Sequence, residues 1–241
     1  MREHLILLPG WAIGAAALEP LREALLERAP HLQVDIEALP ELGQSGAWLD
    51  ALDARLPADC WLAGWSLGGM LAAQLAARRG DACRGLVGVC SNACFRARED
   101  WPTAMPQAVF AAFHEACRLD PVQTLKRFSL LVAQGARDPR TLARQLQVTQ
   151  PALPAEVLDA GLRLLSVLDT RAALQGYAGP QLHLFAEHDA LVPAAAAQAL
   201  LDWLPDVEVN VLPGSSHGLP LEQPDEVAAA ILAFMREGSD V

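Results

Sequence analysis

One short motif constrains the fold of this chain more than any other feature: Gly64-Trp65-Ser66-Leu67-Gly68. It stands between an apolar stretch at 60–63, which predicts a buried strand, and a helical pattern at 70–77. Such a turn holds the serine in a strained backbone conformation, and flanking glycines let strand and helix approach closely. The motif therefore predicts a nucleophilic serine at a strand end. The alternative is a structural turn that happens to contain serine.

Six short apolar runs alternate with helical patterns along the chain. Because they are rich in Leu, Val and Ile without polar alternation, we expect parallel strands buried on both faces. The runs lie at about 4–8, 32–36, 60–64, 85–90, 181–186 and 207–212, and the helical patterns at 15–28, 46–55, 67–78, 194–203 and 224–236. This alternation predicts an α/β protein with a mainly parallel, doubly wound sheet of about six strands, with ligands at the carboxyl ends of the strands.

One long segment, 95–176, breaks this alternation. It shows no convincing strand and holds several amphipathic helices separated by prolines. A crossover between two strands needs far fewer residues. We therefore expect a helical cap at 95–176, inserted into a core formed by 1–94 and 177–241 and lying over the strand end that carries Ser66.

Composition limits the partners and the cellular compartment. The net charge of −11 argues against nucleic acid. No run approaches the ~18 apolar residues of a membrane span, and the first apolar stretch is too short for a signal peptide. Five cysteines without C-x-x-C spacing argue against zinc and against a disulfide framework. We expect a cytoplasmic protein that binds neither membrane nor metal.

The charge is unevenly distributed along the chain. Residues 96–144 carry eight Arg and Lys against five Asp and Glu, a net charge of +3, so the remainder carries −14. A locally basic segment on an acidic protein suggests an anionic partner there. Solvated helix faces are the alternative explanation of the same charges.

The serine needs a base, and the base needs an acid to orient it. In this type of active site the acid follows the serine in the chain and the histidine comes last. Asp189, in the loop after the expected strand at 181–186, is our choice for the acid. Glu187 could substitute for it, whereas Asp202 and Asp206 fit surface positions.

The base is expected after the last strand, where His217 stands in a Gly/Ser loop that can bring its imidazole over the sheet. His188 is the competing candidate. It lies beside Asp189, so it could hardly bond to that carboxylate and also reach Ser66. A loop histidine without a role is the remaining alternative. This chemistry requires no cofactor.

Two backbone amides are expected to stabilise the oxyanion. One belongs to Leu67, directly after the serine, and the other to Trp11, in the loop after the first strand. The Trp11 indole would then lie along the pocket. For Trp65, the sequence does not separate a core role from a role in the site.

Four motifs in this order carry a family resemblance: Leu-Leu-Pro-Gly-Trp at 7–11, Gly-Trp-Ser-Leu-Gly-Gly at 64–69, His-Asp-Ala-Leu-Val-Pro at 188–193 and Ser-Ser-His-Gly at 215–218. With them the chain resembles the BioH-type pimeloyl-[acyl-carrier protein] methyl ester esterases, which are carboxylesterases of biotin biosynthesis with an α/β-hydrolase fold. The likeness runs nearly end to end, and the strings at 126–131 and 161–171 are its more specific parts. Many relatives have His where this chain has Pro9.

The resemblance implies a serine carboxylesterase with Ser66, Asp189 and His217 as the catalytic triad. We expect the protein to be a monomer. It also implies site roles outside the triad: Trp11 and Phe128 lining the acyl channel, and Arg127, Arg140 and Arg144 holding the acyl carrier protein. The implied substrate is the methyl ester of carrier-linked pimeloyl, and the alcohol released is methanol. The same fold and triad would serve a general short-chain carboxylesterase or a thioesterase, and a non-catalytic binding protein is a further alternative.

Overall fold

The computed structural model describes residues 3–239, which contain one six-stranded sheet in the order β2-β1-β3-β4-β5-β6. The strands are β1 (His4–Leu8), β2 (Gln33–Ile36), β3 (Cys60–Trp65), β4 (Cys83–Val89), β5 (Gln181–Ala186) and β6 (Glu208–Leu212). Every neighbouring pair is parallel. The sequence prediction of a parallel six-stranded sheet is confirmed, and each observed strand begins and ends within two residues of its predicted bounds.

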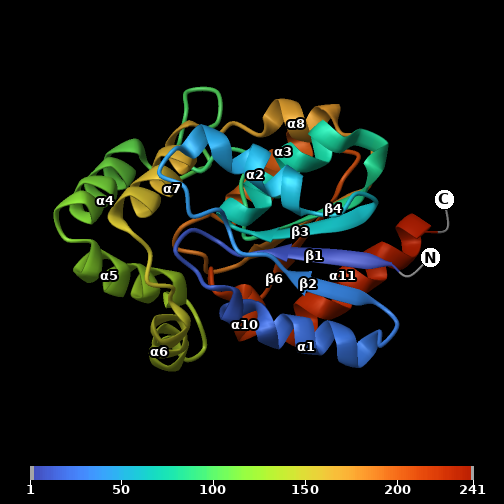
Figure 1. The fold of residues 1–241 in the computed structure, drawn as a ribbon, viewed down its shortest axis with the longest axis horizontal. Coiled ribbons are helices and arrows are strands. Elements are labelled where there is room, and N and C mark those ends of the chain that lie inside the picture. The colour runs from blue at the N-terminus through green and yellow to red at the C-terminus, as the bar shows by residue number, and fades with distance from the viewer. Residues whose placement is uncertain (1–2, 240–241) are drawn as a thin grey trace.

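Helices cover both faces of the sheet. The core helices are α1 (Glu19–Arg28), α2 (Trp48–Arg55), α3 (Leu67–Arg79), α9 (Ala195–Trp203), α10 (Leu219–Glu222) and α11 (Pro224–Ser239), with short 3-10 helices at Ala15–Leu18, Ser45–Ala47 and Gly80–Ala82. In Figure 1, α1, α10 and α11 lie below the sheet and α2 and α3 above it. The central strands β3 and β5 are fully buried between these layers.

The expectation that all six strands are buried on both faces is wrong for the two edge strands. In β6, Glu208, Asn210 and Val211 are exposed, and in β2 Gln33 and Asp35 are exposed. An edge strand has a neighbour on one side alone, and the helices cover less of its faces. All of these exposed side chains are polar except Val211, which is an exposed apolar residue.

Five helices lie between β4 and β5, and most of them project beyond the carboxyl ends of the strands. They are α4 (Gln107–Leu119), α5 (Pro121–Ala133), α6 (Pro139–Thr149), α7 (Ala155–Val167) and α8 (Arg171–Gly176). In Figure 1, α4 to α7 form a group at the left, whereas α8 packs against α3. The inserted helical region is confirmed, and the bounds 95–176 for a separate cap stay our proposal.

Two prolines of this region begin helices, as their chemistry favours. Pro121 and Pro139 occupy the first positions of α5 and α6, where a missing N–H costs nothing because that group has no partner within the helix. The preceding Asp120 and Asp138 accept hydrogen bonds from the backbone N–H groups of Gln123 and Thr141 and so cap the two helices.

The structure also bears on membrane insertion and on disulfide formation. Within residues 3–239, every helix is too short or too polar to cross a bilayer. The five cysteines are free and buried.

Candidate active site

Ser66 sits at the sharp turn between β3 and α3. Its backbone has φ 56° and ψ −118°, a conformation that strains a residue with a side chain. The two flanking glycines permit the turn, because a Cβ on Gly64 would collide with the backbone of Gly68, and one on Gly68 with the carbonyl of Pro9. The strand–serine–helix geometry predicted from the motif is therefore present, and the Ser66 side chain lies at its apex.

Ser91, which the sequence interpretation missed, supports this turn. Its hydroxyl donates to the backbone carbonyl of Ser66 over 2.9 Å, in addition to the bonds that this carbonyl accepts from Gly69 and Met70 of α3. A Cβ on Gly69 would lie 2.7 Å from the Ser91 hydroxyl oxygen. The sequence signal for this contact was the second glycine of Gly68-Gly69, because a residue without a side chain there leaves room for Ser91, which follows β4.

Asp189 and His217 form a buried hydrogen-bonded pair. His217 Nδ1 lies 2.7 Å from Asp189 Oδ2, and the two side chains are 0% and 1% exposed. The other carboxylate oxygen accepts the backbone N–H groups of Leu191 and Val192, each over 2.8 Å. An ionised carboxylate only accepts, so His217 donates from Nδ1 and keeps the lone pair of Nε2 free. That nitrogen is buried and has no hydrogen-bond partner among the described residues.

The competing candidates lie elsewhere. Glu187 accepts from the backbone N–H of Gly214, and its side chain is about half exposed. His188 is 53% exposed and faces Glu187. Asp202 and Asp206 are exposed, as expected for surface residues.

Trp65, whose role the sequence left open, is a buried core residue that also contacts the loop carrying His217. Its indole N–H donates to the backbone carbonyl of His217 over 2.8 Å, and its side chain is 1% exposed. The strand that ends at Ser66 is thus tied to the loop that carries the imidazole. No hydrogen bond joins the Ser66 hydroxyl to His217 Nε2 in this structure.

Glu222 of α10 is a second residue that the sequence interpretation missed. Its carboxylate accepts from the backbone N–H and the hydroxyl of Ser216, over 3.0 and 2.8 Å, and from the backbone N–H of Arg137 over 2.9 Å. The N–H of Gly218 also donates to the carbonyl of Val132 in α5. The residues on both sides of His217 are therefore bonded to the inserted region: Gly218 directly to α5, and Ser216 through Glu222 to the loop between α5 and α6.

The two predicted oxyanion donors flank Ser66. Leu67 is the first residue of α3, so its N–H has no partner within the helix. The loop of Trp11 lies against the serine, because a Cβ on Gly10 would come within 3.3 Å of Ser66 Cβ. The backbone N–H of Trp11 donates to no acceptor in the part of the chain that the structure describes. Both amides are thus available to an anionic oxygen.

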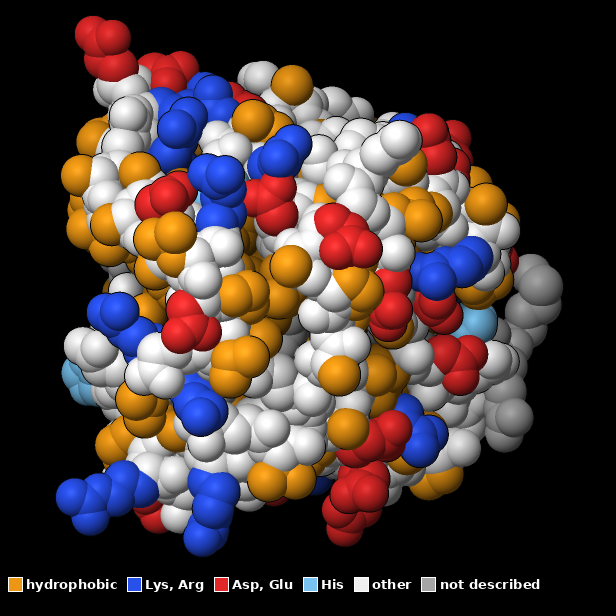
Figure 2. Space-filling model, turned by 60° about the vertical axis from the view of Figure 1, so that its left-hand side comes forward, with side chains coloured by type: hydrophobic (Ala, Val, Ile, Leu, Met, Phe, Trp, Pro, Cys, Tyr) orange, Lys and Arg blue, Asp and Glu red, His pale blue; other side chains and the backbone are white. Residues whose placement is uncertain are grey.

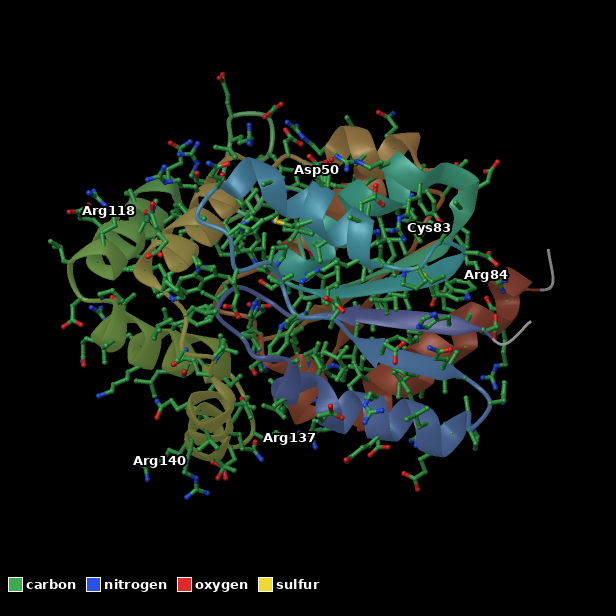
Figure 3. All side chains as sticks on the ribbon, in the orientation of Figure 1. Asp50, Cys83, Arg84, Arg118, Arg137 and Arg140 are labelled. Carbon is green, nitrogen blue, oxygen red and sulfur yellow. The ribbon has the colours of Figure 1, made fainter. Side chains whose placement is uncertain are left out.

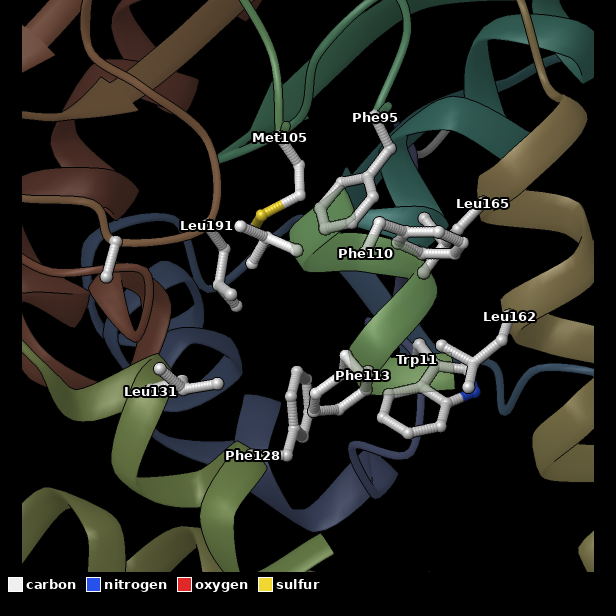
Figure 4. A pocket seen from close by; sticks show the side chains of 12 residues that line it. Trp11, Phe95, Met105, Phe110, Phe113, Phe128, Leu131, Leu162, Leu165 and Leu191 are labelled. Carbon is white, nitrogen blue, oxygen red and sulfur yellow. The ribbon is translucent and has the colours of Figure 1, made fainter. Parts of the chain in front are cut away.

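An apolar cavity of about 110 Å³ lies between the core and α4, α5 and α7. Figure 4 shows its wall of aromatic and aliphatic side chains, which carries no charged group. Trp11 and Phe128 both line it, with ring centroids 4.9 Å apart in an edge-to-face arrangement. Leu191, two residues after Asp189, lines it as well. The two residues predicted to line an acyl channel are therefore neighbours beside the acid loop.

The predicted carrier-binding arginines lie on one side of the inserted region. Arg127 of α5 and Arg140 and Arg144 of α6 are exposed and form no ion pair with any described residue. Figure 3 shows Arg140 extending outward from α6, and Figure 2 shows a few separate Lys or Arg side chains at the lower left of its view. Most other arginines between residues 3 and 239 are paired with Asp or Glu, so these positive charges are available to a partner.

One group of side chains has the composition of a metal site. Cys90, Asp189 and His217 place potential ligand atoms within 4.8 Å of one another. Burial raises the pKa of the Cys90 thiol well above its ordinary value, so the thiol stays protonated. A protonated thiol is a poor metal ligand, and the carboxylate and imidazole already bond to each other. The donor set therefore favours a hydrogen-bonded pair over a bound ion.

Comparison with known proteins places the chain in a family. Residues 5–230 match the alpha/beta hydrolase family model. The chain is 33% identical over 97% of its length to a pimeloyl-[acyl-carrier protein] methyl ester esterase of Yersinia pseudotuberculosis, covering 93% of that protein, and 34% identical to the protein of that name from Klebsiella pneumoniae. It is 37% identical to the biotin biosynthesis bifunctional protein BioHC of Cellvibrio japonicus, of which it spans about half (47%).

Solved structures show the same fold at lower identity. A bromoperoxidase from Bacillus anthracis matches with a TM-score of 0.84 at 18% identity, covering 98% of this chain and 92% of that one. An esterase from Exiguobacterium antarcticum matches with a TM-score of 0.82 at 17% identity, covering 97% and 92%. Fold and sequence together show that this chain belongs to the alpha/beta hydrolase family and, within it, to the pimeloyl-[acyl-carrier protein] methyl ester esterases.

Proposed function

We propose that this protein is a serine carboxylesterase that hydrolyses the methyl ester of pimeloyl-[acyl-carrier protein] and releases methanol, a step of biotin biosynthesis. The observation that carries the proposal is the buried Asp189–His217 pair, tied through Trp65 to the strand that ends at Ser66. The relatives that share 33–34% of its residues are named for this reaction.

Ser66, His217 and Asp189 have separate roles in the proposed reaction. The Ser66 hydroxyl oxygen attacks the ester carbonyl carbon while His217 Nε2 takes the hydroxyl proton. Asp189 holds the imidazole in the tautomer that makes Nε2 the base. His217 then gives the proton to the departing methoxide, which leaves as methanol. A water molecule, deprotonated by the same nitrogen, attacks the acyl-enzyme and releases the free carboxylate and Ser66.

The amides of Trp11 and Leu67 stabilise the negative charge that develops on the carbonyl oxygen. Each such donor contributes about 3 kcal/mol of transition-state stabilisation when it is held in place before the reaction. Leu67 is held by the start of α3. Trp11 is held through its side chain, whose indole N–H donates to the carbonyl of Leu158 over 2.9 Å.

The apolar cavity suits the acyl chain. Aromatic and aliphatic side chains line it, among them Trp11 and Phe128. Burial of methylene groups against them is favourable, whereas a charged group would find no partner there. We place the methylene chain of the acyl group there, beside the acid loop.

The exposed arginines supply the second half of substrate recognition. Acyl carrier protein is acidic, and the enzyme itself carries a net charge of −11, so the two would repel each other without a local positive surface. Arg127, Arg140 and Arg144 provide such a surface. We propose that they hold the carrier while its acyl chain enters the cavity.

One set of experiments tests this function. The purified protein should release methanol from pimeloyl-[acyl-carrier protein] methyl ester, should be labelled by a fluorophosphonate probe, and should restore growth without biotin to a strain blocked at this hydrolysis step. Ser66→Ala should lose all three properties while staying folded. Equal turnover of free short-chain esters and the carrier-linked ester would favour a general esterase instead. Absent labelling of folded protein would favour a non-catalytic binding protein.

A further inference from the structure

Gly161 occupies a position where glycine is unusual. It is a buried residue in the middle of α7, with several helical residues on either side. Glycine destabilises a helix interior relative to alanine, so its presence there calls for a packing reason. The packing reason is that the side chains of Trp11 and Trp48 lie close to its backbone.

The edge of Trp11 fills the space that a side chain at position 161 would take. A Cβ on Gly161 would lie 2.5 Å from Trp11 Cδ1 and 2.9 Å from Nε1, with Trp48 also only 3.2 Å away. One turn earlier in α7, the carbonyl of Leu158 accepts the indole N–H. Figure 4 shows the indole nitrogen directed toward the ribbon of α7. The indole therefore rests directly on the helix backbone.

The opposite side of the same indole forms a wall of the apolar cavity. There Trp11 meets Phe128 and Phe113 edge-to-face, at ring-centroid distances of 4.9 and 5.7 Å. An added methyl group at position 161 cannot be accommodated on the helix side. The indole would have to shift toward Phe128, and the cavity would become smaller.

We propose that Gly161 is a specificity-determining residue: by letting Trp11 rest against α7, it keeps the cavity long enough for a medium-length, unbranched acyl chain. The inference rests on the proposed esterase function. It assigns to one helix position the choice between short and medium acyl chains, although that position does not itself line the cavity.

Chain-length preference tests the proposal. The quantity to measure is kcat/KM for p-nitrophenyl hexanoate divided by kcat/KM for p-nitrophenyl acetate. Gly161→Ala should lower this ratio by about 10-fold or more, because one displaced methylene in an apolar pocket changes rates by about 10- to 200-fold. Gly176→Ala is the matched control, since a Cβ on that helical glycine meets nothing within 4 Å; its ratio should stay at the wild-type value.

The double variant separates the contact from a general disturbance. Trp11→Val keeps the backbone amide but removes the two atoms nearest to a Cβ at position 161, and leaves only the longer contact with Trp48. In that background Gly161→Ala should leave the ratio unchanged, because the wall it displaces is gone. An unchanged ratio in the folded single variant, or an equal fall in both backgrounds, overturns the proposal. Should Gly161→Ala not fold, Trp11→Val alone decides: its preference must move toward longer chains, and an unchanged profile is a refutation.

Failure of the esterase function would be seen separately. If wild type and Ser66→Ala hydrolysed both esters equally slowly, the proposed function would be wrong. The melting temperatures of wild type, the two single variants and the double variant would still report the steric contact. If the changes in melting temperature are additive, residues 161 and 11 do not interact. If they are not additive, the steric contact is supported even though the esterase function is wrong.

Discussion

Trp65 donates its indole N–H to the backbone carbonyl of His217 over 2.8 Å, although the two residues are 152 positions apart in the sequence. The bond is buried, with both side chains almost completely excluded from solvent. It fixes the position of the loop that carries His217 relative to β3, which is followed directly by Ser66. The position of the proposed base thus depends on the residue directly before the proposed nucleophile.

Replacing Trp65 with Phe should therefore slow the chemical step more than it weakens substrate binding. The variant leaves the His217 carbonyl buried without a donor, which costs about 1–3 kcal/mol. We expect kcat for a short ester to fall by about 10-fold or more with a small change in KM, since misplacing a catalytic group affects the transition state. Steady-state kinetics on folded protein provide the measurement. A change confined to KM would contradict this role.

Glu222→Gln should disturb the same loop from the other side. The carboxylate accepts from three donors, and an amide has one acceptor oxygen and an NH₂ group that would face a donor. We expect a fall in kcat and a lower melting temperature. Glu226→Gln, at an exposed position of α11, is the matched control and should match wild type in both measurements. If Glu222→Gln does so too, the loop does not depend on this carboxylate.

Charge reversal on α6 should separate carrier recognition from ester chemistry. Arg140→Glu and Arg144→Glu should raise KM for the carrier-linked methyl ester and leave turnover of a free short-chain ester unchanged. The wild-type preference for carrier-linked ester should weaken as salt screens the charges. Arg236→Glu, near the end of α11 and far from the inserted helices, makes the same charge change and should have little effect (Figure 1). Equal losses on both substrates would argue against a carrier-binding role.

His183 should make folding stability depend on pH. It is buried in β5, its Nε2 has no hydrogen-bond partner among the described residues, and burial lowers its pKa from 6.5 to about 4. Between these two values the unfolded chain binds a proton that the folded protein does not, so stability falls as pH falls. Above pH 6.5 the imidazole of His183 is neutral in both states and does not change the free energy of unfolding with pH. The full difference corresponds to about 3 kcal/mol.

Urea unfolding across that pH range checks this expectation. The free energy of unfolding of His183→Gln should fall less steeply than that of wild type as the medium is acidified. His188→Gln removes an exposed imidazole and should keep the wild-type dependence. Parallel curves for wild type and His183→Gln would show that His183 does not carry the effect.

Much of the fold follows from local sequence patterns. The strand–Ser66–helix turn, the parallel sheet and the inserted helices are confirmed, because apolar runs, glycines and prolines act over a few residues. The expected pairing of Asp189 with His217 also appears as a hydrogen bond, whereas catalysis by Ser66 and the oxyanion roles of Trp11 and Leu67 stay predictions.

Long-range contacts account for what the sequence did not reveal. The roles of Trp65, Ser91 and Glu222 depend on partners brought near by folding, and none of these residues stands in a pattern that names its partner. The exposure of β6 was missed because its apolar run does not show whether the strand will lie at the edge or in the middle of the sheet. Gly161 begins one of the strings that carry the family resemblance, but that string does not reveal the indole packed against it.

Two hydrogen bonds, from Arg137 N–H to Glu222 and from Gly218 N–H to the carbonyl of Val132, join the histidine loop to the inserted helices. A hinged lid that swung away as a rigid unit would pull the base out of register with the nucleophile. We therefore expect this enzyme to admit its substrate while the inserted helices stay in place, through rearrangement of side chains at the cavity mouth. Its resting and working states would then share one backbone shape.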